Sequence, residues 1–231
     1  MLNRVDFVRK PSLAHLSEGG RKIFTDPNAG GNSIFSEVFS YEILRSILGL
    51  KLERTEMELD YWPRGGKITD YSVSTHCGNY LGVSVTRAMC RSEASIFEQE
   101  DAERLLTKKL EGIIQSSKNV YPKFYCDKQI LHILAESDEI AYTLAMCLKT
   151  KSSKFLLQNT IPLLPCSPPS SPQKTFCKEY DSYKIEHKNE ECLGEKKTPY
   201  INFISENNPV FVMISVCKNA TWLFKQKRKI K

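Results

Sequence analysis

Residues 129–135, Gln-Ile-Leu-His-Ile-Leu-Ala, form a short and almost wholly apolar run. A strand with one face in water would alternate apolar and polar residues, and this run does not. We therefore expect a strand buried on both faces, at the centre of a sheet that is covered by helices. His132 within it is either a hydrogen-bonded core histidine or a catalytic base. A second β-rich run, at residues 210–216, is expected to return to the same sheet.

Three segments with apolar residues at helical spacing are predicted to be helices. The first covers residues 34–48, where Ser33 can cap the start and Gly49 is a natural stop. The second covers about residues 98–115, and the acidic residues of its first turn suit the helix dipole. The third covers residues 138–149.

Three strands are predicted between the first two helices, at residues 51–62, 67–75 and 80–88. Turns that contain glycine separate them, so neighbouring strands should pair antiparallel as a meander. In the first strand, alternation places three acids on one face and three apolar residues on the other: Glu56, Glu58 and Asp60 opposite Met57, Leu59 and Tyr61. The acids form either a solvated face or a site for a metal or a basic partner.

The predicted fold class is α/β, with a central mixed β-sheet flanked by helices in the order α-β-β-β-α-β. The chain then divides into five parts. They are an irregular N-terminal segment (1–32), the α/β core (33–149), a flexible insertion rich in proline and serine (150–209), the returning strand of the core (210–224) and a basic tail (225–231).

The net charge of +6 belongs mainly to the C-terminal end. Residues 1–150 hold 19 Lys and Arg against 20 Asp and Glu, whereas residues 225–231 hold five basic residues and no acidic one. A strongly basic nucleic-acid surface on the core is therefore not indicated. Lys227, Arg228 and Lys229 are candidates for phosphate binding or nuclear import, and a solubilising end is the alternative.

Other features bear on location. No apolar run approaches 18 residues, so we expect no spanning helix and no membrane partner. Residues 1–11 are charged and lack the apolar region of a secretory signal. The expected location is therefore intracellular, in the nucleus or the cytoplasm, and the eight scattered cysteines are expected to be thiols.

The predicted element order resembles the core of restriction-endonuclease-like folds, the PD-(D/E)XK superfamily. The chain also resembles a poorly characterised eukaryotic family with this fold, over about residues 30–136. Three stretches carry that resemblance: Gly-Asn-Ser-Ile-Phe-Ser-Glu at 31–37, Thr-Glu-Met-Glu-Leu-Asp-Tyr-Trp-Pro at 55–63 and Gly-Lys-Ile-Thr-Asp-Tyr at 66–71. The resemblance implies an acid on the second strand and an acid-x-Lys motif on the third, which hold a divalent metal against the scissile phosphate.

Under this resemblance, Asp70 takes the place of the second-strand acid and Glu37 that of a first-helix acid, as catalytic residues and Mg²⁺ ligands. Helical spacing independently places Glu37 on the apolar face of its helix and Glu42 well away from that face. A buried carboxylate needs a metal or another partner, and both alternatives stay open. Asp60 becomes a third ligand if it points toward Asp70.

The third strand departs from the pattern. The family's strand would read Gly-Val-Glu-Val-Lys-Arg-Ala, and residues 82–88 read Gly-Val-Ser-Val-Thr-Arg-Ala. Ser84 and Thr86 therefore stand at the acid and lysine positions of a degenerate motif. A hydroxyl is a weak, neutral metal ligand and cannot replace the positive charge of lysine. Arg87 and Lys67 both alternate away from Asp70.

The sequence thus predicts a nuclease-like protein with an incomplete metal site, which binds nucleic acid or a protein partner without cleavage. One alternative is an active nuclease or phosphodiesterase that uses Glu37, Asp70 and Asp60. The only cofactor expected is then Mg²⁺. The other alternative is an interaction scaffold with no role in nucleic-acid binding.

Overall fold

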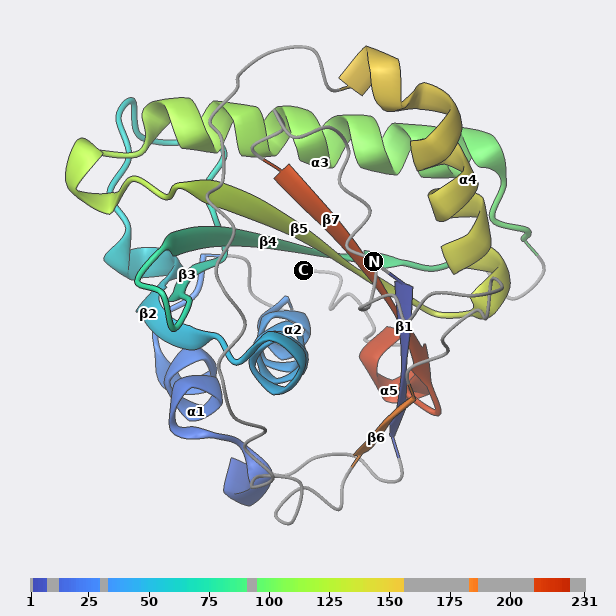
Figure 1. Cartoon of the computed structure of the whole chain (residues 1–231), viewed down its shortest axis with the longest axis horizontal. Coiled ribbons are helices and arrows are strands. Elements are labelled where there is room, and N and C mark those ends of the chain that lie inside the picture. The colour runs from blue at the N-terminus through green and yellow to red at the C-terminus, as the bar shows by residue number, and fades with distance from the viewer. Residues whose placement is uncertain are drawn as a thin grey trace, which may run out of the picture.

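Figure 1 shows the computed structural model of the chain, in which one mixed sheet runs between two groups of helices. The structure describes residues 2–7, 13–29, 33–90, 95–155, 183–186 and 210–224. A mixed sheet with flanking helices confirms the predicted α/β class.

The sheet has seven strands in the order β2-β3-β4-β5-β7-β1-β6. The first three pair antiparallel, the four from β4 to β1 pair parallel, and β6 pairs antiparallel with β1. Their bounds are β1 Leu2–Phe7, β2 Lys51–Thr55, β3 Tyr71–Ser74, β4 Tyr80–Ala88, β5 Lys128–Ala135, β6 Tyr183–Glu186 and β7 Val210–Lys218. The predicted antiparallel meander is therefore confirmed.

Each face of the sheet has its own helices (Figure 1). One face packs against α1 (Glu18–Thr25), α2 (Ile34–Leu48) and α5 (Thr221–Phe224). The other face packs against α3 (Gln99–Asn119) and α4 (Asp138–Phe155). The described residues also include three short 3-10 helices: η1 Leu13–His15, η2 Glu56–Glu58 and η3 Pro122–Phe124.

The strand β5 is buried along its whole length, as the apolar run predicts. Ile130 and Leu134 point into the core between the sheet and α2. Leu131 and Ile133 point into the core on the other face, between the sheet and α3 and α4. Side chains of β5 therefore belong to both cores, so α2 packs on one side of this strand and α3 on the other.

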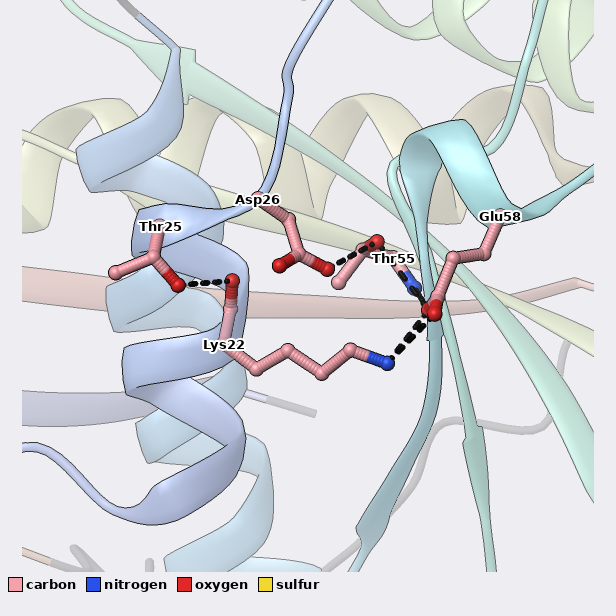
Figure 2. A network of polar contacts seen from close by, with 5 residues as sticks. All are labelled: Lys22, Thr25, Asp26, Thr55 and Glu58. Carbon is pink, nitrogen blue, oxygen red and sulfur yellow. Dashed lines mark hydrogen bonds and ion pairs between the residues drawn. The ribbon is translucent and has the colours of Figure 1, made fainter.

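The predicted strand 51–62 is wrong beyond Thr55, where the chain turns into η2. The Glu58 carboxylate accepts hydrogen bonds from the Thr55 backbone N–H at 2.9 Å and from Lys22 Nζ at 2.7 Å, which closes the turn (Figure 2). The predicted alternation is lost as a result. Glu56 becomes 7% exposed and Met57 becomes 55% exposed, the reverse of the expectation.

The N-terminal segment 1–32, predicted to be irregular, contains β1 and α1. β1 pairs parallel with β7, so its partner lies more than 200 residues away in sequence. α1 is only two turns long, and Ser17 caps it by accepting a hydrogen bond from Gly20 N. Short elements with distant partners leave little local signal.

Other boundaries shift. α3 runs to Asn119 rather than 115, and α4 runs to Phe155, beyond the predicted start of the insertion at 150. Ser33, the predicted cap of α2, makes no side-chain cap hydrogen bond, but Gly49 ends the helix at φ 67° as expected. Within the predicted insertion 150–209 the structure also describes β6; the rest of that prediction lies outside the described residues.

Candidate functional site

Asp70 precedes β3 by one residue, at the point where β3 and β4 begin to pair. Its backbone N–H donates to the Val83 carbonyl at 3.0 Å, and its carboxylate Oδ2 accepts from Val85 N at 2.5 Å. Because Tyr71 pairs with Val83, Asp70 lies opposite Ser84. The carboxylate is therefore fixed against β4.

Glu37 lies in the first turn of α2 and is 2% exposed, so its predicted place on the buried face is confirmed. Its Oε2 accepts a hydrogen bond from Asn28 Nδ2 at 2.8 Å. The prediction that Glu42 points away from the core is wrong. Glu42 is equally buried, because α1 covers that side of α2 and Ser17 donates to its carboxylate through N and Oγ.

Glu56 joins this group because η2 turns its side chain inward. It is 7% exposed, and its Oε2 accepts from Ala29 N at 2.8 Å. Burial raises the pKa of Glu56, the Ala29 hydrogen bond opposes the rise, and the negative charge of Glu37 adds to it. Glu37 and Glu56 therefore lie within electrostatic reach of each other.

Asp70 experiences the same charges. Burial, and after it the negative charge of Glu37, raise the pKa of Asp70 to about 7; Glu56 contributes in the same direction. The ammonium of Lys109 and the Val85 hydrogen bond oppose that rise. Glu37, Glu56 and Lys109 thus all lie within electrostatic reach of Asp70.

Lys109 comes from α3 and donates from Nζ to the Val85 carbonyl at 3.0 Å. The same peptide region of β4 also donates to Asp70 through Val85 N. Lys109 therefore supplies a positive charge beside Asp70, which Thr86 cannot. Sequence reasoning missed Lys109, although a lysine three residues after Leu106 and four before Ile113 lies on the apolar stripe of the helix.

Ser84 and Thr86 lie on β4, in the strand predicted for residues 80–88. Ser84 is buried and Thr86 is half-buried, and neither brings a carboxylate or an ammonium to the site. Asp60 does not join Asp70: its carboxylate is 59% exposed and forms an ion pair with Lys123 at 3.6 Å. The predicted shared face of Glu56, Glu58 and Asp60 is absent because η2 replaces the strand.

The fit of a metal can be judged from the donor set. Carboxylate oxygens are the ligands that Mg²⁺ prefers, and it commonly uses one or two of them with water and phosphate oxygens. Asp70 and Glu37 match that need. In the described part of the chain, no group of three or more His, Cys, Asp or Glu side chains is arranged to hold a metal ion. A site enclosed by protein ligands alone is therefore not found there.

His132 is a core histidine. It is fully buried, its Nδ1 is 2.7 Å from Ser40 Oγ and its Nε2 is 2.7 Å from Ser215 Oγ. Burial lowers its pKa to about 3, so the ring is neutral. Both nitrogens have partners, which favours the structural alternative. Lys227, Arg228 and Lys229, the predicted phosphate-binding residues, lie outside the described residues.

Comparison with known proteins finds a relative that covers part of the chain. No family model and no solved structure matches the chain. Over 140 residues, 58% of the chain, it is 41% identical to the AAC-rich mRNA clone AAC4 protein of Dictyostelium discoideum. The match covers 20% of that protein's length. Among the described residues, no helix is both long and apolar enough to cross a membrane.

Proposed function

We propose that this chain is a nuclease-like α/β protein whose incomplete metal site binds nucleic acid without cleaving it. The observation that carries the proposal is that Asp70 accepts a hydrogen bond from Val85 N while Lys109 donates to the carbonyl of the same residue, with Glu37 and Glu56 within electrostatic reach of Asp70. These residues come from α2, η2, α3 and the position just before β3, so the fold brings them together. We place this activity in the nucleus or the cytoplasm.

The chemistry of the group fits a phosphate that is bound through a cation. Burial is the largest cause of the raised pKa of Asp70, and a second cause is repulsion from the nearby carboxylates of Glu37 and Glu56. Bound Mg²⁺ would relieve it by contacting Asp70 and Glu37 and a phosphate oxygen of the ligand. Lys109 would add positive charge beside that phosphate. The family's pattern has a carboxylate at the position of Ser84, so the metal would have one carboxylate ligand fewer here. This favours binding of nucleic acid over its cleavage.

Fluorescence anisotropy of labelled oligonucleotides tests the proposal. We expect the full chain to bind at 50 mM salt, to bind more tightly with Mg²⁺, and to lose affinity steeply toward 200 mM salt. Asp70→Asn should lose the Mg²⁺ dependence, whereas the matched control Asp60→Asn should retain it, because Asp60 lies outside the site. An absence of binding at 50 mM salt, with and without Mg²⁺, would overturn the proposal and leave the interaction scaffold.

An active Mg²⁺-dependent phosphodiesterase is the second candidate, and Lys109 is the observation that favours it. Its ammonium lies beside Asp70 and could stabilise the charge that develops on a phosphate during cleavage. Nicking of supercoiled plasmid with Mg²⁺ or Mn²⁺ tests it. Nicking that is lost in both Asp70→Ala and Lys109→Met but persists in Asp60→Asn supports catalysis. If the wild-type chain binds without nicking, the non-catalytic proposal stands.

A further inference from the structure

A cluster of exposed aromatic residues lies where the C-terminal end of α3 meets the segment after η2. Trp62 is 69% exposed, Tyr121 is 43% exposed and Tyr125 is 51% exposed. Burying such rings would be favourable, and a rigid exposed ring offers a flat contact surface to a partner. We call these three residues, with Phe124 and the cations beside it, the aromatic patch.

Backbone pairing holds two of these rings on the same face. Tyr61 and Val120 form an isolated antiparallel bridge, flanked by hydrogen bonds from Trp62 N to Asn119 O at 2.7 Å and from Tyr121 N to Asp60 O at 3.0 Å. Side chains alternate along extended chains, so Trp62 and Tyr121 lie opposite the buried ring of Tyr61. Diagonal neighbours of this kind are about 7 Å apart.

Positive charge accompanies the rings. Arg54 Cζ lies 5.0 Å and Lys123 Nζ lies 4.4 Å from the centroid of the Phe124 ring. Lys123 also forms an ion pair with Asp60 at 3.6 Å, so its ammonium contacts both a carboxylate and a ring. Aromatic rings interleaved with cations are the combination that binds unpaired bases and their phosphates.

The segment after Trp62 leads from the aromatic patch along α3 to Asp70. A Cβ at Gly66 would lie 3.4 Å from Asn119 Nδ2, and one at Gly112 would lie 3.6 Å from Lys67 Cγ, so the segment after Trp62 follows α3. From Asn119 back to Lys109 the helix rises about 15 Å. That distance corresponds to about four phosphates of one strand at duplex spacing.

We propose that the aromatic patch docks a single strand of nucleic acid, with Trp62 and Tyr121 stacking on unpaired bases and the strand leading along α3 toward Asp70. This inference rests on the proposed function and names its ligand class: a single strand, DNA or RNA, rather than a duplex. Stacking tolerates any base, so affinity comes from ring faces and phosphates and not from base sequence.

Binding of fluorescein-labelled oligo(dT) and oligo(U) dodecamers, and of a duplex of equal length, tests the inference with the full chain. We expect the wild type to prefer single strands. Trp62→Ala and Tyr121→Ala should each weaken single-strand binding by about 5-fold to 100-fold. Tyr142→Ala is the matched control, because Tyr142 is 66% exposed on α4 and away from the aromatic patch. It should bind like the wild type.

Quenching of intrinsic fluorescence supplies a readout that does not depend on folding differences between variants. The second tryptophan, Trp222, packs edge-on against Phe39 with ring centroids 4.9 Å apart, so quenching by a stacked base should come from Trp62. The quenching should disappear in Trp62→Phe. Unchanged affinity in both alanine variants, or preference for the duplex, overturns this inference alone. An absence of all nucleic-acid binding by the wild type overturns the proposed function with it.

Discussion

At the scale of single residues, Asp70 is an acid that the fold makes hard to ionise, because burial and Glu37 raise its pKa from 3.8 to about 7. The folded state holds this proton more tightly than the unfolded chain. The stabilising contribution is therefore complete below about pH 4 and is lost as the pH rises through about 7. We predict that Asp70→Asn raises the free energy of unfolding by about 1–2 kcal/mol at pH 8, after allowance for solvent screening at this half-buried group.

Urea unfolding in metal-free buffer at pH 5 and pH 8 measures this effect. The asparagine oxygen can still accept the hydrogen bond from Val85 N, so the variant removes the charge and little else. Asp60→Asn serves as the control, because its exposed carboxylate should change the free energy of unfolding by less than about 0.5 kcal/mol at either pH. Parallel pH profiles for wild type and Asp70→Asn would contradict the prediction.

The site residues differ in how well the sequence could predict them. The helical period alone placed Glu37 on a buried face, because a first-turn acid among apolar neighbours is conspicuous. Asp70 came from the family resemblance and not from the residues themselves. Lys109 and Glu56 were missed as partners of Asp70, because their approach depends on how α3 packs on β4 and on the turn at η2.

At the scale of elements, η2 is held to α1 by Glu58. This carboxylate accepts from Thr55 N, which closes a capping box, and from Lys22 Nζ, which joins the two elements (Figure 2). Desolvation is the largest single influence on this carboxyl and raises its pKa, but the hydrogen bonds from Lys22 and Thr55 and the charge of Lys22 together outweigh it and lower the pKa of Glu58. We predict that Glu58→Ala lowers the free energy of unfolding at pH 7 by about 1 kcal/mol, mostly through the lost cap.

The sign of its pH dependence is opposite to that of Asp70. The stabilisation is present above the usual pKa of 4.5 and is lost as the pH falls through the lower folded value. Urea unfolding at pH 7 and pH 3 should therefore show a difference between wild type and Glu58→Ala at pH 7 that shrinks at pH 3. If the free energy of unfolding differs between wild type and variant by the same amount at both pH values, the ionised carboxylate of Glu58 does not stabilise the fold.

His132 joins three elements in the same core. Ser40 of α2 and Ser215 of β7 occupy its two ring nitrogens, and Ser40 also lies 2.7 Å from the Tyr71 hydroxyl of β3. We predict that His132→Ala costs about 3–5 kcal/mol in the free energy of unfolding, because it leaves a cavity and orphans the Ser215 hydroxyl, whereas Ser40 keeps Tyr71 as a partner. Ser215→Ala, which removes one bond, should cost less. Equal stability of His132→Ala and wild type in urea would contradict a structural role.

Element prediction succeeded where the signal is local. Residues 80–88 and 34–48 match β4 and α2 at both ends, because strict alternation and a terminal glycine mark them. It failed at residues 56–62, where the sequence alternates like a strand but Glu58 closes a turn. Alternation reports which residues are apolar and polar, whereas the turn depends on a hydrogen bond between a side chain and the backbone.

At the scale of the whole molecule, the parallel half of the sheet is completed by the first residues of the chain. β1 pairs with β7 on one side and with β6 on the other. The local pattern of residues 1–32 gave no sign of this, since the pairing joins segments at opposite ends of the sequence. The central strand was predictable because seven consecutive, almost wholly apolar residues indicate burial on both faces.

Substitutions in β1 test whether the N-terminal segment is irregular or forms a strand of the core. Val5 is fully buried and packs in the core between the sheet and α2, whereas Leu2 on the same strand is 53% exposed. We predict that Val5→Asp lowers the free energy of unfolding by about 3 kcal/mol or more, because it buries an unpaired charge, and that Leu2→Asp stays within about 1 kcal/mol of wild type. Urea unfolding of both variants, with the yield of folded protein, measures the difference. If the two variants behave alike, β1 does not belong to the cooperative core, and the seven-stranded sheet would have to end at β7.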